Sequence, residues 1–394
     1  MKTNQLQTNI PDGWKFHKLD DLLTFVVDNR GKTPPIQSSG IPMAEVNAIG
    51  DKNIKYSEIT KFVSEETYRN WFRKHLEKND ILFSTVGRTA SCSIYTADIK
   101  TVIAQNLIGL RFGKDNPEFM FYLLTQDRNN QEFKNIEMSA AQPSVKVSQM
   151  IHLEFLVPPL SEQNRIVSVL ETWDKSIEKL TQKIETKKQV KEYLMWDLLT
   201  GKKRLAGFKD KWQTVEIGEL LDYEQPTKYI VSSTDYSDEY KTPVLTANKG
   251  FILGYTNETD GIYKNTPVII FDDFTMDNKF VDFDFKVKSS AMKMLSPKNK
   301  DVNLKFVFER IQLLNIVIGE HRRHYLSEYQ YITIDMPDIK EQNAITNILV
   351  TADKEITELE KKLSIIKEQK RYLLNNLITG TIRTPETLSA KITK

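Results

Sequence analysis

The residue types that metal-dependent nucleases use occur in two short patterns. Asp-x-Lys stands at 98–100 and again at 284–286, and Asp272 and Asp273 lie upstream of the second pattern. Clustered carboxylates beside a lysine are suited to holding a metal ion that activates water. The run VDFDFKVK (281–288), however, alternates so that its charged residues share one face of a strand, which fits a polar sheet face equally well. We therefore predict no catalytic residue here, and nuclease activity stays the less favoured alternative.

A second dense segment is the run His321-Arg322-Arg323-His324-Tyr325. Two histidines three residues apart, without a carboxylate partner, are a weak metal-binding pattern. The single cysteine, Cys92, supplies neither a disulfide nor a zinc ligand set. Arginine and histidine tips instead suit phosphate groups and base edges. The sequence therefore predicts no metal site and makes this run a candidate nucleic-acid contact.

Motifs for two other enzyme classes are missing. An adenine methyltransferase needs an Asn/Asp-Pro-Pro-aromatic motif, and the Pro-Pro pairs in TPPI (33–36) and VPPL (157–160) do not fit it. No GxxxxGK[ST] loop is present to cradle the phosphates of ATP. We predict a binding protein without a catalytic centre of its own.

Composition sets further limits on the 394-residue chain. Its 40% hydrophobic and 10% aromatic residues are enough for packed cores. The polar N-terminus is unlike a secretory signal, and no run approaches the roughly 18 apolar residues of a membrane span. We expect a cytoplasmic protein with no membrane partner. The net charge of +2 is small for a nucleic-acid binder, so a basic surface must be local or completed by a partner.

An internal repeat organises the chain. Residues 157–201 align without a gap to residues 336–380 at an offset of 179, and about 19 of the 45 positions are identical. A fainter match joins WKFHKLDDLL at Trp14 to WQTVEIGELL at Trp212. The regions between these matches barely resemble each other. This order predicts one scaffold used twice, with two different working surfaces.

The repeated segments have the pattern of long helices with a coiled-coil seam, since apolar residues recur at alternating spacings of four and three. The helices should begin just after Pro158 and Pro337, with Ser161 and Asp338 as candidate N-caps and Gly201 and Gly380 as C-terminal caps. At about 1.5 Å per residue, each would be roughly 57 Å long. The predicted seam is Ile166, Leu170, Trp173, Ile177, Leu180, Ile184, Leu194 and Leu198, with Ile345, Leu349, Ile356, Leu359, Leu363, Ile366, Leu373 and Leu377.

Two lysines, Lys191 and Lys370, interrupt the seam at the same repeat position, and a polar seam residue usually fixes register. The simplest way to bury both seams is to pack the two copies together, and a two-fold relation between them requires an antiparallel pair. The alternative is a generic dimerisation arm.

These observations predict an α+β protein with two globular domains separated by two long helices, which pack as an antiparallel coiled coil with pseudo-two-fold symmetry. Both variable regions mix strand runs, such as ILFSTV (81–86) and KFVDFDFKV (279–287), with helix-like runs. The predicted parts are a first globular domain (1–157), a first helical spacer (158–208), a second globular domain (209–335) and a second helical spacer with tail (336–394).

The motifs now resemble a known family. PPLSEQ before a long helix that ends in LLTGKKRLAGF, the new start at Trp212, and the second copy MPDIKEQ…LITG resemble the specificity subunit of type I restriction-modification enzymes. NRGKTPP and AQPSVKVSQM are similar to segments of that family. The stretch from YEQPTKYIV to VKSSAMKM resembles a recognition domain of its IC subfamily. The resemblance covers nearly the whole chain, and the repeat is its specific part.

This resemblance implies that each globular domain is a target-recognition domain that reads one half of a bipartite target in double-stranded DNA. It implies that the paired helices set the gap between half-sites and dock two modification (methyltransferase) subunits, and that restriction (motor-nuclease) subunits join the complex. The chain itself is expected to bind no cofactor, while S-adenosylmethionine, ATP and Mg²⁺ are expected on partner subunits. The small net charge keeps a coiled-coil scaffold that binds proteins as the alternative.

Base readout needs Arg, Lys, Asn, Gln or His tips at base edges, and phosphate contact needs basic or hydroxyl groups. At the repeat offset, Gln142 aligns with His321 and Lys146 with Tyr325, so both loops should face DNA. The candidate DNA contacts are Arg30, Lys32, Arg88, Thr89, Gln142, Lys146, Lys228, Tyr229, Lys249, Tyr255, Lys279, His321, Arg322, Arg323 and Tyr325.

Overall fold

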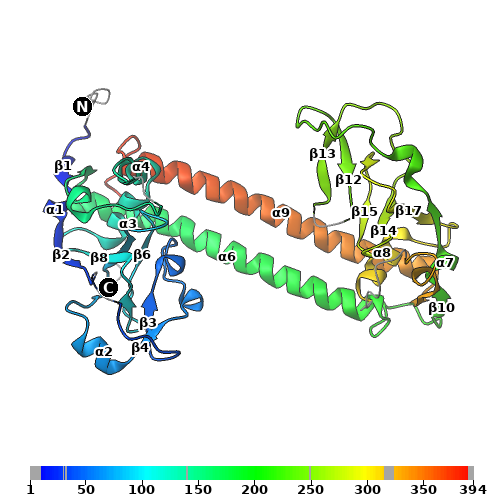
Figure 1. Ribbon diagram of the computed structural model, residues 1–394, viewed down its shortest axis with the longest axis horizontal. Helices are drawn as coiled ribbons and strands as arrows, with labels where there is room; N and C mark the ends of the chain where they lie inside the picture. The colour runs from blue at the N-terminus through cyan, green and yellow to red at the C-terminus, as the bar shows by residue number, and fades with distance from the viewer. Residues whose placement is uncertain are drawn as a thin grey trace. The chain divides into compact units, whose positions relative to one another are not determined.

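The computed structural model describes residues 10–29, 31, 33–138, 141–247, 250–314 and 324–388. The chain forms two compact units, Met1–Leu180 with Lys362–Lys394, and Thr181–Lys361. Each unit holds one α+β domain together with part of each of two long helices (Figure 1). Among the residues described, no helix is both long and apolar enough to cross a membrane.

The first domain is built on a four-stranded antiparallel sheet of order β2-β8-β5-β6, beside a three-stranded sheet β4-β3-β7 and the pair β1-β9. Its strands are β1 (Lys15–Lys18), β2 (Leu23–Val27), β3 (Ile41–Ala44), β4 (Phe62–Val63), β5 (Ile81–Ser84), β6 (Cys92–Ile94), β7 (Val102–Ile103), β8 (Leu107–Phe112) and β9 (Glu154–Val157). Its helices are α1 (Leu19–Leu22), α2 (Glu65–Asn70), α3 (Pro117–Thr125), α4 (Asp127–Asn135) and α5 (Val147–Met150).

The second domain repeats this plan with a four-stranded sheet β11-β17-β14-β15, a three-stranded sheet β13-β12-β16 and the pair β10-β18. Its strands are β10 (Gln213–Glu216), β11 (Leu221–Glu224), β12 (Thr242–Leu245), β13 (Ile252–Thr256), β14 (Val268–Asp272), β15 (Asn278–Val281), β16 (Lys286–Val287), β17 (Met292–Pro297) and β18 (Thr333–Met336). Its helices are α7 (Ile217–Leu220) and α8 (Leu304–Gln312).

The two domains match strand by strand. In each three-stranded sheet the middle strand pairs antiparallel with one neighbour and parallel with the other, as β3 does with β4 and β7, and β12 with β13 and β16. The main sheets are antiparallel throughout. The predicted α+β class and the internal repeat are therefore confirmed, although the two regions hardly resemble each other in sequence.

The long helices are α6 (Leu160–Leu199) and α9 (Ile339–Ile378). Asp338 caps α9 as predicted, because its carboxylate accepts the backbone N–H groups of Lys340 (2.8 Å) and Glu341 (3.1 Å). Ser161 does not cap α6: the helix already begins at Leu160, so that prediction is wrong. Two residues after the end of each helix stands a glycine with left-handed backbone, Gly201 (φ +68°) and Gly380 (φ +73°). Residues with a Cβ rarely adopt this conformation, so both glycines serve as C-terminal caps.

One predicted strand is in fact two. The run 279–287 was expected to be a single alternating strand, but β15 ends at Val281 and β16 begins at Lys286. Asp282 and Asp284 are exposed, whereas Lys286 is buried. Strand alternation does not continue across the interruption, so the charged residues of this run do not share one strand face.

Short helices place the domain cores against the long helices. In the first domain, Asn116 caps α3 by accepting the N–H groups of Glu118 and Phe119, and Pro117 stands at the first helical position, where its lack of an N–H costs nothing. Most of α3 is buried in the main core of its domain, which includes Ile166 and Leu170 of α6. In the second domain α8 is capped in the same way, by Asn303.

Candidate nucleic-acid interface

A buried carboxylate joins the first domain to its helices. Glu162, in the first turn of α6, is 2% exposed. It accepts hydrogen bonds from Nε1 of Trp14 (2.9 Å) and from Nε and Nη2 of Arg383 (2.6 and 2.8 Å). The hydrogen bond with Glu162 raises the pKa of Arg383 above its usual value. One side chain therefore ties together the start of the domain, α6 and the segment that follows α9.

The second domain repeats this arrangement at the offset of the sequence repeat. Glu341 of α9 is fully buried and accepts from Nε and Nη2 of Arg204 (2.7 and 2.5 Å) and from Nε1 of Trp212 (3.0 Å). Its hydrogen bond raises the pKa of Arg204 above the usual value. The faint match between the two tryptophan-led starts thus marks two equivalent attachments.

The next two residues of each repeat hold the capping asparagine of a domain helix. Gln163 accepts the backbone N–H of Asn116 (2.8 Å), and Asn164 accepts from the side chain of Asn116 (2.8 Å). In the second domain Gln342 and Asn343 make the same two bonds to Asn303, at 2.8 and 2.6 Å. The repeated Glu-Gln-Asn triplet is therefore an attachment motif, which explains why it recurs between two unlike domains.

The two long helices run antiparallel within each unit. In the second unit, Lys187 pairs with Glu355 and Lys191 with Asp353, so positions rise along one helix as they fall along the other. All the predicted seam residues are buried or half-buried, with Ile166, Leu170, Ile345 and Leu349 at 1% exposure or less. The predicted antiparallel coiled coil is confirmed.

The lysines that interrupt the seam each meet an aspartate of the opposite helix. Lys370 of α9 pairs with Asp174 of α6, and Lys191 of α6 pairs with Asp353 of α9 (2.5 Å). Asp174 and Asp353 are themselves equivalent repeat positions. A sliding of one helix along the other would separate both pairs and leave partly buried charges without partners, so these contacts oppose changes of register.

The loops at one edge of the first domain are joined by main-chain hydrogen bonds. The N–H of Ala104 donates to Ala44 (2.9 Å), that of Thr85 to Asn106 (2.9 Å), and that of Val145 to Thr85 (2.8 Å). These bonds gather the residues that follow β3, β5 and β7 with the loop that leads into α5. The sequence-predicted loops around Arg88 and Lys146 therefore lie side by side.

The second domain has the same three bonds at the equivalent edge. The N–H of Lys288 donates to Leu245 (3.0 Å), that of Asp273 to Ala291 (2.9 Å), and that of His324 to Asp273 (2.9 Å). Val145 and His324 are separated by the repeat offset of 179. The backbone of this edge is thus the same in both domains, while the side chains that it presents differ.

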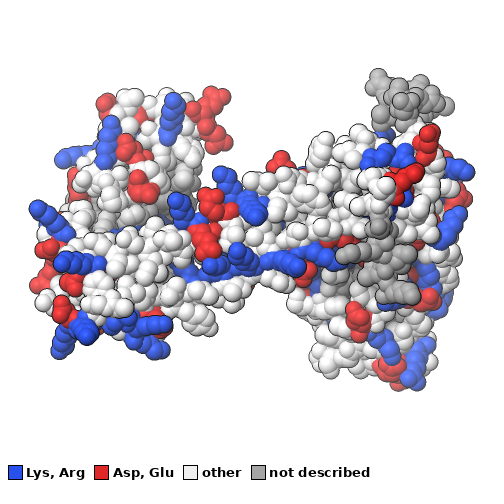
Figure 2. Space-filling model, turned by 180° about the vertical axis from the view of Figure 1, so that it is seen from behind, with Lys and Arg blue, Asp and Glu red and all other residues white. Residues whose placement is uncertain are grey.

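Neither globular domain shows one large basic surface on the face seen in Figure 2. Figure 2 shows acidic and basic side chains interspersed over the visible face of each domain. This agrees with the net charge of +2. Nucleic-acid contact at these edges would therefore rely on a few basic and amide groups, with further positive charge from partners.

Several sequence candidates of the first domain lie at this edge. Gln142 and Lys146 are exposed. Thr89 is only 6% exposed, so its side chain lies inside the domain rather than on the surface. Arg30 and Lys32 fall outside the described residues.

Arg88 has a different environment from the one expected of a free DNA contact. Its Nη2 donates to the backbone carbonyls of Val46 (3.2 Å) and Ile49, and its Nε donates to Ser91 (3.1 Å). A Cβ added to Gly50 would come within 2.7 Å of the same guanidinium. Arg88 therefore holds the loop after β3 against the loop after β5, and this use of its donors limits what it offers to DNA.

Two residues of the predicted basic run belong to the core. His324 is fully buried, and its Nδ1 lies 3.2 Å from Glu328. Tyr325 is 1% exposed and its ring lies 5.6 Å from that of Phe271, so the expectation of a DNA contact from its side chain does not fit its burial. Burial raises the pKa of Tyr325 to about 12. His321, Arg322 and Arg323 lie outside the described residues.

The remaining candidates of the second domain are dispersed. Lys228 is exposed in the turn Pro226–Tyr229, whereas Tyr229 donates to Glu224 (2.8 Å) and packs edge-on against Tyr263. Tyr255 is half-buried in β13, and Lys279 is exposed on β15. Lys249 lies outside the described residues.

The structure also adds edge residues that sequence reasoning missed. Gln105 is exposed and donates to Thr33 of the NRGKTPP segment (3.2 Å), which brings that segment to the first edge. In the second domain Lys288, Ser289 and Ser290 are exposed at the matching position. The matching strand order of the two domains could have located both segments. Each one follows the strand that pairs parallel with the middle strand of its three-stranded sheet.

The Asp-x-Lys patterns do not form a catalytic cluster. Lys286 pairs with Glu258 (2.8 Å) and Lys100 with Glu65 (3.0 Å). Asp273 pairs with the buried Lys293 (3.1 Å). Within the described ranges, no group of three or more His, Cys, Asp or Glu side chains is arranged to hold a metal ion.

Comparisons with known proteins agree with this architecture. A family model described as the type I restriction modification DNA specificity domain matches residues 11–188 and 209–368. The specificity subunit of the type I restriction enzyme EcoR124I/EcoR124II from Escherichia coli is 46% identical over 190 residues, a match that spans 45% of this chain and 46% of that subunit.

A second relative and a solved structure match over nearly the full length. The putative type I restriction enzyme MjaX specificity subunit of Methanocaldococcus jannaschii is 26% identical over 95% of both chains. The crystal structure of a type I restriction-modification S subunit from M. genitalium shares the fold with a TM-score of 0.56 and 15% identity, covering 95% of this chain and 98% of that one.

Proposed function

This chain belongs to the type I restriction modification DNA specificity family, and from that premise we propose that it is the subunit that reads the DNA target of a type I restriction-modification complex. Each globular domain reads one half of a bipartite target. In this proposal methylation and cleavage are the work of partner subunits.

One observation carries this proposal, namely the two loop edges with matching main-chain hydrogen bonds and different side chains. A protein that reads two unlike half-sites needs the same presentation twice and a different set of contacting groups each time. Main-chain bonds hold much of each loop, so exposed side chains such as Gln142 and Lys146 stay available for base edges and phosphates. A scaffold protein has no comparable reason to pair conserved loop geometry with divergent loop chemistry.

The edge side chains have suitable chemistry. Exposed amides such as Gln142 and Gln105 can donate to and accept from adenine in the major groove, and exposed lysines such as Lys146 and Lys288 suit guanine or phosphate. The expected base-reading role of Arg323 rests on sequence alone. Gln142, Gln105 and Lys146 belong to the edge of the first domain and Lys288 to that of the second, so these assignments divide the reading between the two domains.

The antiparallel helices provide the spacing in this proposal. Their seam and the two Asp–Lys pairs hold a single register, so a fixed number of unread base pairs separates the half-sites. The length of α6 and α9 then acts as the ruler for the gap.

Exposed aromatic residues on the helices are our candidate docking points for two modification subunits. Tyr193 and Tyr372 occupy the same repeat position and are 75% and 63% exposed. Tyr193 and Trp196 help line an open groove of about 620 Å³ on α6. Exposed rings of this size are typical anchors of protein interfaces. Two sites on one chain that share this tyrosine would bind two copies of one partner.

The rest of the complex follows from this role. Restriction subunits would join the modification subunits, and S-adenosylmethionine, ATP and Mg²⁺ would be bound by those partners. The complex would act in the cytoplasm, on chromosomal and entering double-stranded DNA.

The methylation map of genomic DNA from cells that express this chain with its neighbouring modification subunit tests the proposal. We expect new adenine methylation at a split motif with two unlike half-sites and a constant unread gap. A modification subunit that is soluble and bound to this chain, yet produces no new methylation, would contradict the proposal and favour the scaffold.

A further inference from the structure

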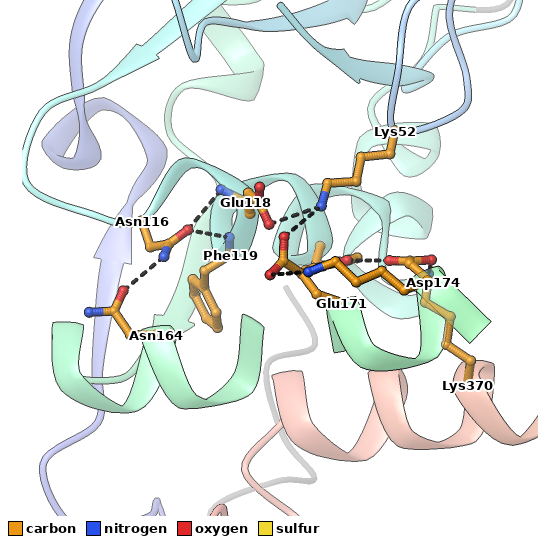
Figure 3. A network of polar contacts seen from close by, with 10 residues as sticks. Lys52, Asn116, Glu118, Phe119, Asn164, Glu171, Asp174 and Lys370 are labelled. Atoms are coloured by element: carbon orange, nitrogen blue, oxygen red, sulfur yellow. Dashed lines mark hydrogen bonds and ion pairs between the residues drawn. The ribbon is translucent and has the colours of Figure 1, made fainter. Parts of the chain in front are cut away.

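The first domain carries a charged cluster that the shared attachment motif does not require. Lys52 lies between two carboxylates, 2.9 Å from Glu118 of α3 and 3.4 Å from Glu171 of α6 (Figure 3). Lys175 of α6 lies 3.9 Å from Glu171. The side chains of the three central residues are between 21% and 34% exposed, so water only partly screens their interactions.

Among the residues that the structure describes, the second domain shows no such cluster at the matching place. Counted from the capping asparagine, the equivalent of Glu118 is Lys305, which pairs with Glu309 of its own helix (2.7 Å). The repeat equivalent of Glu171 is Val350, which is 45% exposed. Since the second domain is attached by the Glu-Gln-Asn triplet without these contacts, attachment alone does not explain the cluster of the first domain.

The third member, Lys52, connects the cluster to the loop edge. It follows the segment Val46–Gly50 that Arg88 binds through backbone carbonyls. Ser93 fixes the intervening turn by accepting from the N–H of Gly50 (3.2 Å) and donating to the carbonyl of Asp51 (2.5 Å). Arg88 therefore holds the Val46–Gly50 loop on the side of the loop edge, which we call its front. Lys52, which follows this loop, holds the opposite side, its rear, to α3 and α6.

We propose that Lys52, Glu118 and Glu171 are positioning residues for the first DNA half-site, because they fix the rear of the Val46–Gly50 loop and thereby the placement of Arg88 and its loop. This inference rests on the proposed DNA-reading function. It assigns to the first domain a dependence on helix-borne charges that the second domain lacks.

The two carboxylates share the cluster unequally. Burial, together with the hydrogen bond to Glu171, raises the pKa of Glu118 above its ordinary value of 4.5. Burial also opposes ionisation of Glu171, but the hydrogen bond with Glu118 and the two lysines outweigh it and lower the pKa of Glu171. The cluster therefore favours ionisation of Glu171 over ionisation of Glu118.

Other charged groups face the cluster from each neighbouring element. Asp174 of α6 accepts from the hydroxyl of Tyr122 on α3 (2.5 Å) and pairs with Lys370 of α9. Lys52 and Lys370 both lie over the ring of Tyr122, at 5.7 and 5.3 Å from its centroid. These groups add one cation, Lys370, and one anion, Asp174, to the cluster, so a change of charge at Glu118 acts within a connected set.

The raised pKa of Glu118 makes the stability of the cluster depend on pH. A carboxyl whose pKa is raised in the folded protein stabilises the fold below its ordinary pKa, and that contribution is lost as pH rises through the raised value. Rising pH therefore ionises Glu118 beside Glu171, and the cost of burying a second carboxylate, together with the repulsion between the two, weakens the cluster although Lys52 attracts both. Reading of the first half-site should weaken with it.

The test uses the full chain assembled with its modification subunits and the target found by methylation mapping. Binding is measured to the intact target, to a duplex with the first half-site scrambled, and to one with the second scrambled. For Lys52→Met we expect discrimination at the first half-site to fall by about tenfold and discrimination at the second to stay within about twofold of wild type. Lys52→Arg, which keeps the charge, should restore most of the difference.

Lys305→Met is the matched control, since it removes the lysine of the equivalent helix position in the second domain. It should leave discrimination at the first half-site within about twofold of wild type, because Lys305 and its partner Glu309 belong to the other domain. Glu118→Gln, whose side chain cannot ionise, should lose the decline in first-half discrimination that wild type shows as pH rises through the raised pKa of Glu118.

The outcomes separate the two proposals. Equal behaviour of Lys52→Met and Lys305→Met at the first half-site, or an equal loss at both half-sites, would overturn the positioning role. If Lys52→Met unfolds, as judged by its thermal melt, the pH profile of Glu118→Gln decides, and a decline as steep as that of wild type counts against the inference. Failure of the proposed function would appear earlier, as a wild-type complex without a split target.

Discussion

The two globular domains share a backbone plan but are held differently. The second domain is attached through Glu341, Gln342 and Asn343. The first domain has the equivalent triplet and, in addition, contacts from α3 and α4 to the helices. In one of these, Asp127 of α4 accepts from both Arg371 and Asn375 of α9, at 3.0 and 3.1 Å. The comparison separates what any domain on this scaffold needs from what the first domain has added.

The largest expected effect comes from changing the scaffold that both domains share. Insertion of one heptad at Leu180 of α6, with a matching heptad in α9, keeps the seam in phase and adds about 10 Å of helix. The gap between half-sites should grow by roughly three base pairs, and methylation of the original target should be lost.

Methylation mapping of the insertion variant checks this prediction, and the half-site sequences themselves should be unchanged. A variant with seven exposed substitutions in place of the insertion provides the control for altered composition. An unaltered gap in the insertion variant would show that the helices do not set the spacing.

The next effect concerns the two buried attachment carboxylates. Glu341→Ala leaves the guanidinium of Arg204 and the indole of Trp212 without their acceptor, which should lower the free energy of unfolding by about 2–4 kcal/mol. Glu162→Ala should cost less, because Arg383 is more exposed than Arg204 (42% against 27%) and the added contacts of the first domain remain.

Urea unfolding of the two variants measures this order. Glu355→Ala, which removes only an exposed pair with Lys187, should stay within about 0.5 kcal/mol of the wild-type chain. A larger loss for Glu162→Ala than for Glu341→Ala would refute the view that the first domain has the more redundant attachment.

Removal of the exposed rings at one docking point should weaken partner binding there and leave the other docking point unaffected. Tyr193→Ala together with Trp196→Ala should weaken the binding of one modification subunit by about tenfold and leave the site at Tyr372 intact. Analytical ultracentrifugation should then show complexes with a single modification subunit. Loss of both subunits together, or of neither, would place docking elsewhere.

The smallest effects belong to single contacts at the loop edges. Lys146→Ala should weaken DNA binding by about threefold and reduce its salt dependence by about one released ion, with the second half-site read as before. Arg323→Ala, whose position is assigned from sequence alone, should alter reading of the second half-site only. Titrations at several salt concentrations check both variants, and an equal change at both half-sites would indicate a defect of assembly.

The sequence predicts the repeated parts of this molecule far better than the unrepeated ones. Periodicity identified the seam, the glycine caps and the lysines that interrupt the seam, because each copy of the helix repeats them. Ser161 was placed wrongly as a cap because α6 begins at Leu160, the repeat equivalent of Ile339, and the position before it holds Pro159 where the second copy has the capping Asp338.

The loop edges could not be predicted because main-chain atoms make the bonds that define them. Ala104 and Lys288, or Val145 and His324, share a backbone role without any likeness of side chain. Arg88 illustrates the opposite difficulty, since an arginine in a glycine-containing turn has the composition of a nucleic-acid contact whether it faces DNA or, as here, backbone carbonyls.

The loop edges also bear on how such a protein changes over generations. Because amide and carbonyl groups of the main chain hold much of the loops, most replacements of exposed side chains at the loop edges should change the free energy of unfolding very little. A lineage can therefore accumulate new residues at the loop edges, and with them new targets, without first passing through unstable intermediates. The same tolerance to substitution makes the loop edges a surface on which directed evolution can test many side chains while the helices and their attachment carboxylates are kept constant.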